Sequence, residues 1–154
     1  MGFPINVHAL DLTATPTVPT QPLGARVIAT DNQEYVYVQA SGAITQYDAV
    51  GIDENYQAAA LTKAIADDGH TIGFAQVAFA DNDYGFVATK GSNIEVRVAI
   101  NCAADVALYT TGTAGVLDDS STSQTKIDGI VAVAAVTAAT NTEIIATQPK
   151  STTF

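Results

Sequence analysis

Residues 93–101, NIEVRVAIN, decide the fold class because they carry the cleanest β pattern of the chain. Apolar and more polar side chains alternate here, with the apolar ones at Ile94, Val96, Val98 and Ile100. Successive side chains of a strand point to opposite faces, so one face of this strand is apolar and the other is partly polar. We therefore expect the four apolar residues to face inward, and Glu95 and Arg97 to face solvent or a partner.

On both sides of this stretch the chain reads as short strands separated by Gly, Asp, Asn and Ser. The expected strands cover residues 25–30, 34–40, 43–52, 72–80, 84–89, 106–110, 115–117, 126–136 and 142–148. One helix is expected over residues 61–68, with Thr62 as N-cap and Gly69 as the stop. Asp67 and Asp68 would lie at its C-terminus, where the helix dipole disfavours acidic groups, so the helix should be short. These patterns predict a mainly β chain: a small antiparallel β-barrel, β-tulip or sandwich body with an extended N-terminal arm and at most one short helix.

A weak internal repeat relates residues 48–89 to residues 105–147. Positions 48 and 105, 73 and 129, and 89 and 147 match at nearly equal separations, and residues 93–101 lie between the copies. A true duplication implies two similar β-units that close one barrel or sandwich and so hide their edges. Shared alternation alone would also give this likeness. We expect residues 24–154 to form a single β-domain in either case.

Residues 1–23, MGFPINVHALDLTATPTVPTQPL, predict the extended arm because they hold four of the five prolines. Proline donates no backbone hydrogen bond and pushes its predecessor toward extended backbone, so neither a long helix nor a central strand fits. An extended apolar arm lies on a neighbouring molecule, packs on its own body or stays loose; we favour the first. Tyrosine is also common at interfaces, and ordinary half-buried aromatic residues of strands are the alternative for the tyrosines of the body. The candidate partner interface is therefore Phe3, Pro4, Ile5, Val7, Leu10 and Leu12 of the arm, with Tyr35, Tyr37 and Tyr84 of the body.

Composition excludes several classes of partner. The 154 residues include 16 acidic and 6 basic side chains, for a net charge of −10, and the bases are scattered. Nucleic acid binding needs a basic stripe, and anionic membranes attract basic segments, so we expect neither partner. The N-terminus lacks a basic n-region and no apolar run is long enough for a bilayer, so we expect no signal peptide and no span. The single cysteine, Cys102, fits folding in a reducing cytoplasm.

Residues able to carry chemistry are sparse and far apart in the sequence. The chain has two histidines, His8 and His70, and neither lies near Cys102 in sequence, so we expect no metal site and no cysteine nucleophile. Residues 81–85, DNDYG, superficially match the start of a calcium loop, but the glycine comes one position early and Ser92 replaces the closing glutamate. No phosphate-binding or nucleophile-elbow motif is present. We therefore expect no catalytic residues, no metal and no cofactor.

The order of strand and turn motifs along the chain resembles that of small structural proteins of tailed-phage virions, above all head decoration (capsid cement) proteins. The segments that carry the resemblance are GAITQYDAVGID (42–53), TIGFAQVAF (71–79), YGFVATKGSNIEVRVAIN (84–101), DVALYTTGTAGVLDD (105–119) and KIDGIVAVA (126–134). The family pattern of a strand, Leu-Tyr, a turn, Ala-Gly-Val-Leu, a polar loop and Ile-Gly-Ile/Phe-Ala is matched by residues 108–109, 114–117, and 72–75 or 127–132.

The resemblance covers residues 24–148 and implies a non-enzymatic protein. It would be made in the host cytoplasm and would bind the major capsid protein on the outside of an assembled capsid. It implies self-association, often as a trimer, and an N-terminal arm that reaches neighbouring subunits. The family has no catalytic motif to carry over. Two alternatives stay open: another virion component, such as a head–tail joining, tail or fibre-associated protein, and a non-viral β-domain for scaffolding or adhesion.

Overall fold

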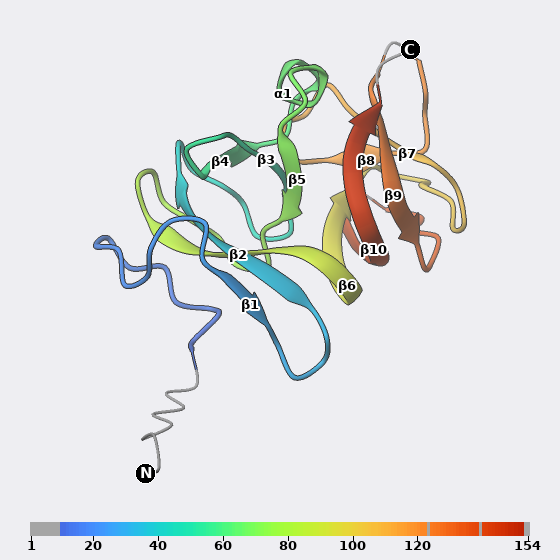
Figure 1. Ribbon diagram of the computed structural model, residues 1–154. Coiled ribbons are helices and arrows are strands. Elements are labelled where there is room, and N and C mark those ends of the chain that lie inside the picture. The colour runs from blue at the N-terminus through green and yellow to red at the C-terminus, as the bar shows by residue number, and fades with distance from the viewer. Residues whose placement is uncertain (1–9, 123, 139, 153–154) are drawn as a thin grey trace.

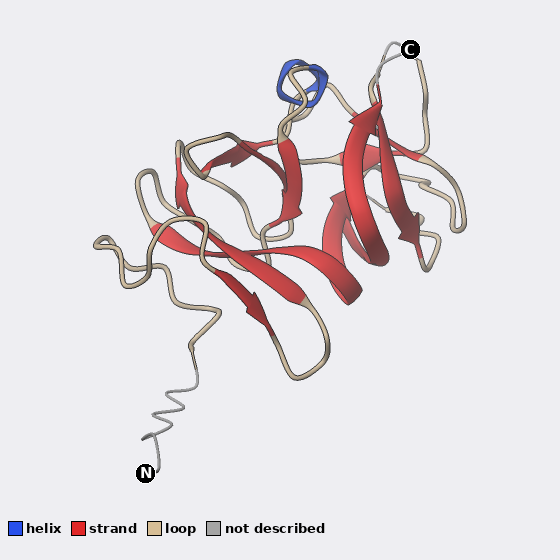
Figure 2. Ribbon diagram, viewed as in Figure 1, coloured by secondary structure: helices blue, strands red, loops and turns tan. Residues whose placement is uncertain are grey.

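The computed structural model describes residues 10–122, 124–138 and 140–152, and it is mainly β, as predicted (Figure 1). Within these ranges the chain forms ten strands and one short helix (Figure 2). The elements are β1 (Arg26–Ile28), β2 (Glu34–Ala40), β3 (Ala49–Ile52), β4 (Gln57–Ala60), α1 (Lys63–Asp67), β5 (Thr71–Phe74), β6 (Tyr84–Val98), β7 (Leu108–Thr110), β8 (Leu117–Asp118), β9 (Lys126–Ala132) and β10 (Thr140–Thr152).

The described strands close into two rings that share β6. The sheet runs in the order β1-β2-β4-β3-β5-β6-β10-β9-β7-β8, and further pairings join β2 to β6 and β6 to β8. The first barrel therefore consists of β2, β4, β3, β5 and residues 84–90 of β6. The second barrel consists of residues 91–98 of β6 with β10, β9, β7 and β8. Figure 1 shows the two groups of strands on either side of the molecule, with β6 running from one to the other.

Both barrels have the same strand order and the same strand directions. In each, the first strand pairs in parallel with a short strand, and every other neighbour is antiparallel. Three backbone hydrogen bonds of the first barrel recur at equivalent positions of the second. Ser41 N to Ala58 O corresponds to Ala99 N to Leu117 O, and Phe79 N to Ile44 O corresponds to Val136 N to Cys102 O. Tyr47 N to Ala75 O corresponds to Asp105 N to Ala132 O. Tyr47 and Asp105 also share left-handed backbone, with φ of 69° and 56°.

Two apolar clusters fill the body, and strand alternation assigns residues to them. The cluster inside the first barrel contains Val36, Val38, Val50, Ala75 and Val87. The larger cluster contains Ile94, Val96, Val98, Leu108, Ile130, Ile144 and Ala146 of the second barrel, together with Ile72, Phe74 and Ala88 from the outer side of the first. The second barrel therefore covers the outer side of the first barrel at β5 and at Ala88 of β6.

The structure corrects the sequence analysis at β6. Residues 84–89 and 93–101 were expected as separate strands, yet a single strand runs from Tyr84 to Val98. Ile94, Val96 and Val98 are buried, as predicted, but Ile100 is 60% exposed. The strand ends at Val98 and residues 100 and 101 form a turn, so the alternation no longer applies at Ile100. β4 was not predicted, because Gln57–Ala60 is too short and too alanine-rich to give a strand signal.

The helix follows the prediction closely. α1 spans Lys63–Asp67, and the Thr62 side chain accepts a hydrogen bond from Ile65 N as an N-cap. Lys63 Nζ donates to Asp67 Oδ2 at 2.5 Å. Thr125 also donates a hydrogen bond, from Oγ1 to Asp67 Oδ1. These partners stabilise an acidic group at a helix end where the dipole alone would disfavour it.

Candidate functional site

The described part of the arm lies against the first barrel. Tyr84 N donates to Pro16 O at 2.9 Å, and Thr20 N donates to Tyr37 Oη at 3.0 Å. Gly85 permits this close approach, because a Cβ at that position would lie 3.0 Å from Ala14 O and 2.7 Å from Phe79 Cε1. These contacts tie residues 14–20 to the body, which fits the self-packed alternative for that stretch.

The N-terminal part of the candidate interface is only partly described. Phe3, Pro4, Ile5 and Val7 lie outside the described residues. Leu10 is 43% exposed, and Leu12 is half-buried. The chain therefore carries an exposed leucine at the point where the description of the arm begins.

The three tyrosines of the candidate interface do not form one exposed surface. Tyr37 is only 1% exposed, because its ring stacks on Tyr84 at 6.4 Å, meets Phe86 edge-on at 4.9 Å and lies under the arm. In this structure the arm and its aromatic neighbours therefore cover Tyr37, which was expected at the partner interface. Tyr84 is half-buried.

Tyr35 is half-buried and lies away from the arm contacts. Its Oη donates to Gln33 Oε1 at 2.5 Å, and the residue packs against the larger apolar cluster. Burial raises the pKa of the Tyr35 hydroxyl, and the nearby Asp31 carboxylate adds to the rise. The hydroxyl therefore stays protonated at neutral pH.

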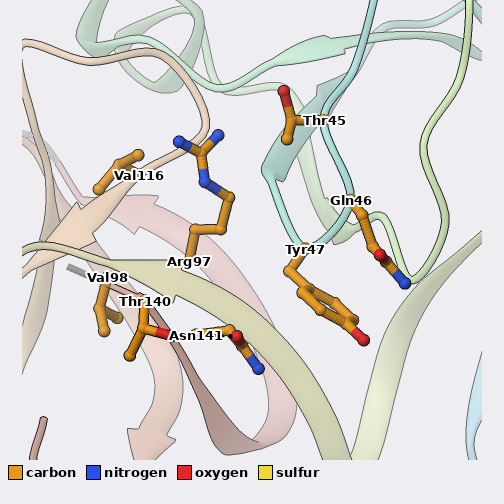
Figure 3. A pocket seen from close by; sticks show the side chains of 8 residues that line it. All are labelled: Thr45, Gln46, Tyr47, Arg97, Val98, Val116, Thr140 and Asn141. Atoms are coloured by element: carbon orange, nitrogen blue, oxygen red, sulfur yellow. Dashed lines mark hydrogen bonds between the residues drawn. The ribbon is translucent and has the colours of Figure 1, made fainter. Parts of the chain in front are cut away.

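An open pocket of about 350 Å³ lies where the two barrels meet, and Figure 3 shows the side chains around it. Its lining consists of Thr45, Gln46 and Tyr47 from the loop before β3, Arg97 and Val98 from β6, Val116, Thr140 and Asn141. Arg97 Nη1 donates to Asp48 Oδ1 at 2.5 Å, and Thr45 N donates to Asp48 Oδ2 at 2.9 Å. The Asp48 side chain is 4% exposed, so an ion pair that is buried on one side joins the barrels.

Glu95 and Arg97 do not simply face solvent. Both point away from the interior of the second barrel, as expected, but both rest against the first barrel. Arg97 N donates to Tyr47 O at 2.8 Å, and the Gln76 amide bridges the Glu95 backbone at 3.0 and 3.1 Å. The backbone groups of both residues and the Arg97 side chain tie the two barrels together, whereas Glu95 Oε2 is buried without a hydrogen-bond partner.

Cys102 is not placed to act as a nucleophile. It is 1% exposed. Burial, together with the nearby carboxylates of Asp119 and Asp118, raises its pKa to about 11. The thiolate is the reactive form, so a protonated buried thiol is chemically inert at neutral pH.

An exposed apolar patch on β9 and β10 was missed by the sequence analysis. Val131 and Ile145 lie directly opposite each other across the two strands, and they are 43% and 46% exposed. Val133, just beyond the end of β9, is 47% exposed. The repeat gives no signal for this patch, because Val131 and Ile145 match positions that are buried in the first copy.

Direct signs of a biochemical activity are few in the described ranges. No group of three or more His, Cys, Asp or Glu side chains there is arranged to hold a metal ion. Among the same residues, no helix has the length and apolar character to cross a bilayer. No protein-family model matches this chain, and comparison with curated proteins finds no significant match.

Proposed function

We propose that this chain is a non-enzymatic structural protein of a tailed-phage virion that binds the outer surface of an assembled capsid and stabilises it. The observation that carries the proposal is the arm. Residues 14–20 are fixed to a rigid double-barrel body, and the apolar sequence at Phe3, Ile5, Val7 and Leu10 continues beyond that anchor. A short apolar segment anchored on a rigid body loses less entropy on binding than a free tail does.

The charge and the shape of the body support the same proposal. Net charge of −10 keeps a free decoration protein soluble before it meets the capsid. At the open pocket between the barrels, the Arg97 side chain already pairs with the buried carboxylate of Asp48. Many copies on a lattice would add avidity even if each attachment is weak.

The test is binding to shells assembled from the major capsid protein encoded by the same genome. Full-length chain should sediment with the shells, and a chain that lacks residues 1–9 should bind at least about tenfold more weakly, because the apolar side chains of Phe3, Ile5 and Val7 are gone. This truncation spares residues 14–20, which pack on the body. The two proteins should show the same circular dichroism and the same unfolding midpoint.

Point variants test whether binding depends on the apolar side chains of the arm or only on its length. A triple variant Phe3→Ser, Ile5→Ser and Val7→Ser should lose binding like the truncation, whereas Asn6→Ser with His8→Ser should bind like the parent. If the full chain does not bind the shells at all, the proposed function is wrong. If the truncated chain binds as tightly as the parent, the arm is not the attachment site.

A further inference from the structure

The outer side of the first barrel carries a cross-strand pair that the second barrel covers. Phe74 of β5 and Ala88 of β6 lie directly opposite each other, and both are 0% exposed. They belong to the same apolar cluster as Ile94, Ile144 and Ala146, which line the second barrel. A β-barrel of this topology is therefore complementary to this face.

The equivalent pair in the second barrel is Val131 and Ile145. Ala75 and Ala132 accept equivalent backbone hydrogen bonds, so the preceding residues Phe74 and Val131 occupy matching positions. Their cross-strand partners, Ala88 and Ile145, then match as well. The strand alternation agrees with this match. Ala88 follows Val87, which points into the first barrel, and Ile145 follows Ile144, which points into the second.

The two equivalent pairs differ in what covers them. Phe74 and Ala88 are buried, whereas Val131 and Ile145 are 43% and 46% exposed, and Val133 extends the apolar surface beside them. Val131, Val133 and Ile145 adjoin on one sheet face, since the backbone pairing continues at Val133, and contiguous exposed apolar surface is the kind that marks interaction sites. Within one chain, the equivalent face at Phe74 and Ala88 is covered by a β-barrel, namely the second one.

We propose that the face formed by Val131, Val133 and Ile145 binds a second copy of this chain, whose barrel covers it as the second barrel covers Phe74 and Ala88. The contact is heterologous, because it joins this face to a different surface of the next copy. Repetition then closes a ring or extends as a row, depending on the rotation between copies. This surface is distinct from the N-terminal arm, and the inference does not depend on capsid attachment.

The charge of the chain gives the contact a distinctive salt dependence. Two copies that each carry a net charge of −10 repel each other, while the proposed contact is apolar. Added salt screens the repulsion and leaves the apolar contact intact, so association should strengthen as NaCl rises. A contact built on ion pairs would weaken instead.

The test is sedimentation equilibrium of the purified full-length chain over a range of protein and NaCl concentrations. The parent should show a mass that rises with protein concentration and with salt. Ile145→Lys should weaken association at least about tenfold, because it places a charge in the apolar contact. The matched control is Ile100→Lys, the same substitution at a residue that is 60% exposed beyond the end of β6, and it should associate like the parent.

Val131→Thr guards against a folding defect, because it keeps the shape and β-propensity of valine while making the face polar. It should unfold at nearly the parent midpoint and still associate more weakly. A parent chain that is monomeric under every condition would overturn the proposal, as would an Ile145→Lys protein, or a folded Val131→Thr protein, that associates as tightly as the parent. None of these three results bears on the shell-binding experiment, which measures the attachment of the arm to a capsid.

Discussion

Arg97 and Asp48 form an ion pair across the boundary between the two barrels, with Arg97 Nη1 2.5 Å from Asp48 Oδ1. Arg97 comes from the shared strand β6, and Asp48 lies in the loop that leads into β3 of the first barrel. The carboxylate also accepts a hydrogen bond from Thr45 N. One buried acid thus fixes a loop and joins two units that are also held together by hydrogen bonds, by apolar packing and by the continuity of β6.

Removing the arginine should destabilise the protein more than neutralising the acid. Arg97→Met leaves a buried carboxylate without its cation and should cost about 3 kcal/mol in urea unfolding, the low end for a broken buried pair because Arg97 is partly exposed. Asp48→Asn keeps an acceptor for Thr45 N and should cost about 1–2 kcal/mol. The double variant should cost less than the sum of the two. If the free energy of unfolding of Arg97→Met lay within about 0.5 kcal/mol of the parent value, the ion pair would not contribute measurably to stability.

Residues 98 and 100 should respond oppositely to the same substitution. Val98→Asp places an unpaired charge in the larger apolar cluster, at a site that is 2% exposed, and should prevent folding. Ile100→Asp lies in the turn after β6 at 60% exposure and should change stability by less than about 0.5 kcal/mol. Circular dichroism and urea unfolding of the two variants check this. A soluble Val98→Asp protein that unfolds cooperatively would mean that the face assignment of β6 is wrong.

The hydroxyl of Tyr37 should anchor the arm. Tyr37→Phe keeps the ring contacts with Tyr84 and Phe86 but removes the acceptor for Thr20 N. Amide hydrogen exchange at Thr20 should become much faster, while global stability should fall by only about 1 kcal/mol. Tyr37→Ala should cost about 3–5 kcal/mol, because it also empties the space under the arm. An unprotected Thr20 amide in the parent protein would contradict the arm contact.

Asp67 should contribute to acid sensitivity. The hydrogen bond from Lys63, followed by that from Thr125, lowers the pKa of this carboxyl below its usual value. Its folded pKa therefore lies below its unfolded pKa, so its stabilising effect is present above the unfolded pKa and is lost as the pH falls through the folded pKa. Asp67→Asn should reduce stability at neutral pH and make its loss on acidification less steep. Asp68→Asn is the control, since Asp68 follows the helix as its C-cap while Lys63 and Thr125 donate to Asp67, and it should unfold at nearly the parent midpoint at pH 7. Matching unfolding midpoints for Asp67→Asn and the parent at pH 7 would refute the assignment.

The sequence by itself determined the elements whose signal is local. The alternation in residues 93–101 predicts the inward face of β6 at Ile94, Val96 and Val98, and the N-cap Thr62 predicts the start of α1. Both follow from contacts within a few residues along the chain, which propensity and periodicity describe well. The same local patterns, together with a composition poor in charge, predict the mainly β fold with one short helix.

Only the tertiary structure decided which outward-facing residues are free. Tyr37, Arg97 and Phe74 all lie on outer faces of their barrels, but the arm, the Asp48 loop and the second barrel cover them in turn. Val131 and Ile145 have the same local pattern as the buried pair Phe74 and Ala88, yet they remain exposed. Strand periodicity fixes which way a side chain points relative to its own sheet, whereas burial depends on contacts between residues distant in sequence, and these arise only when the two barrels pack together.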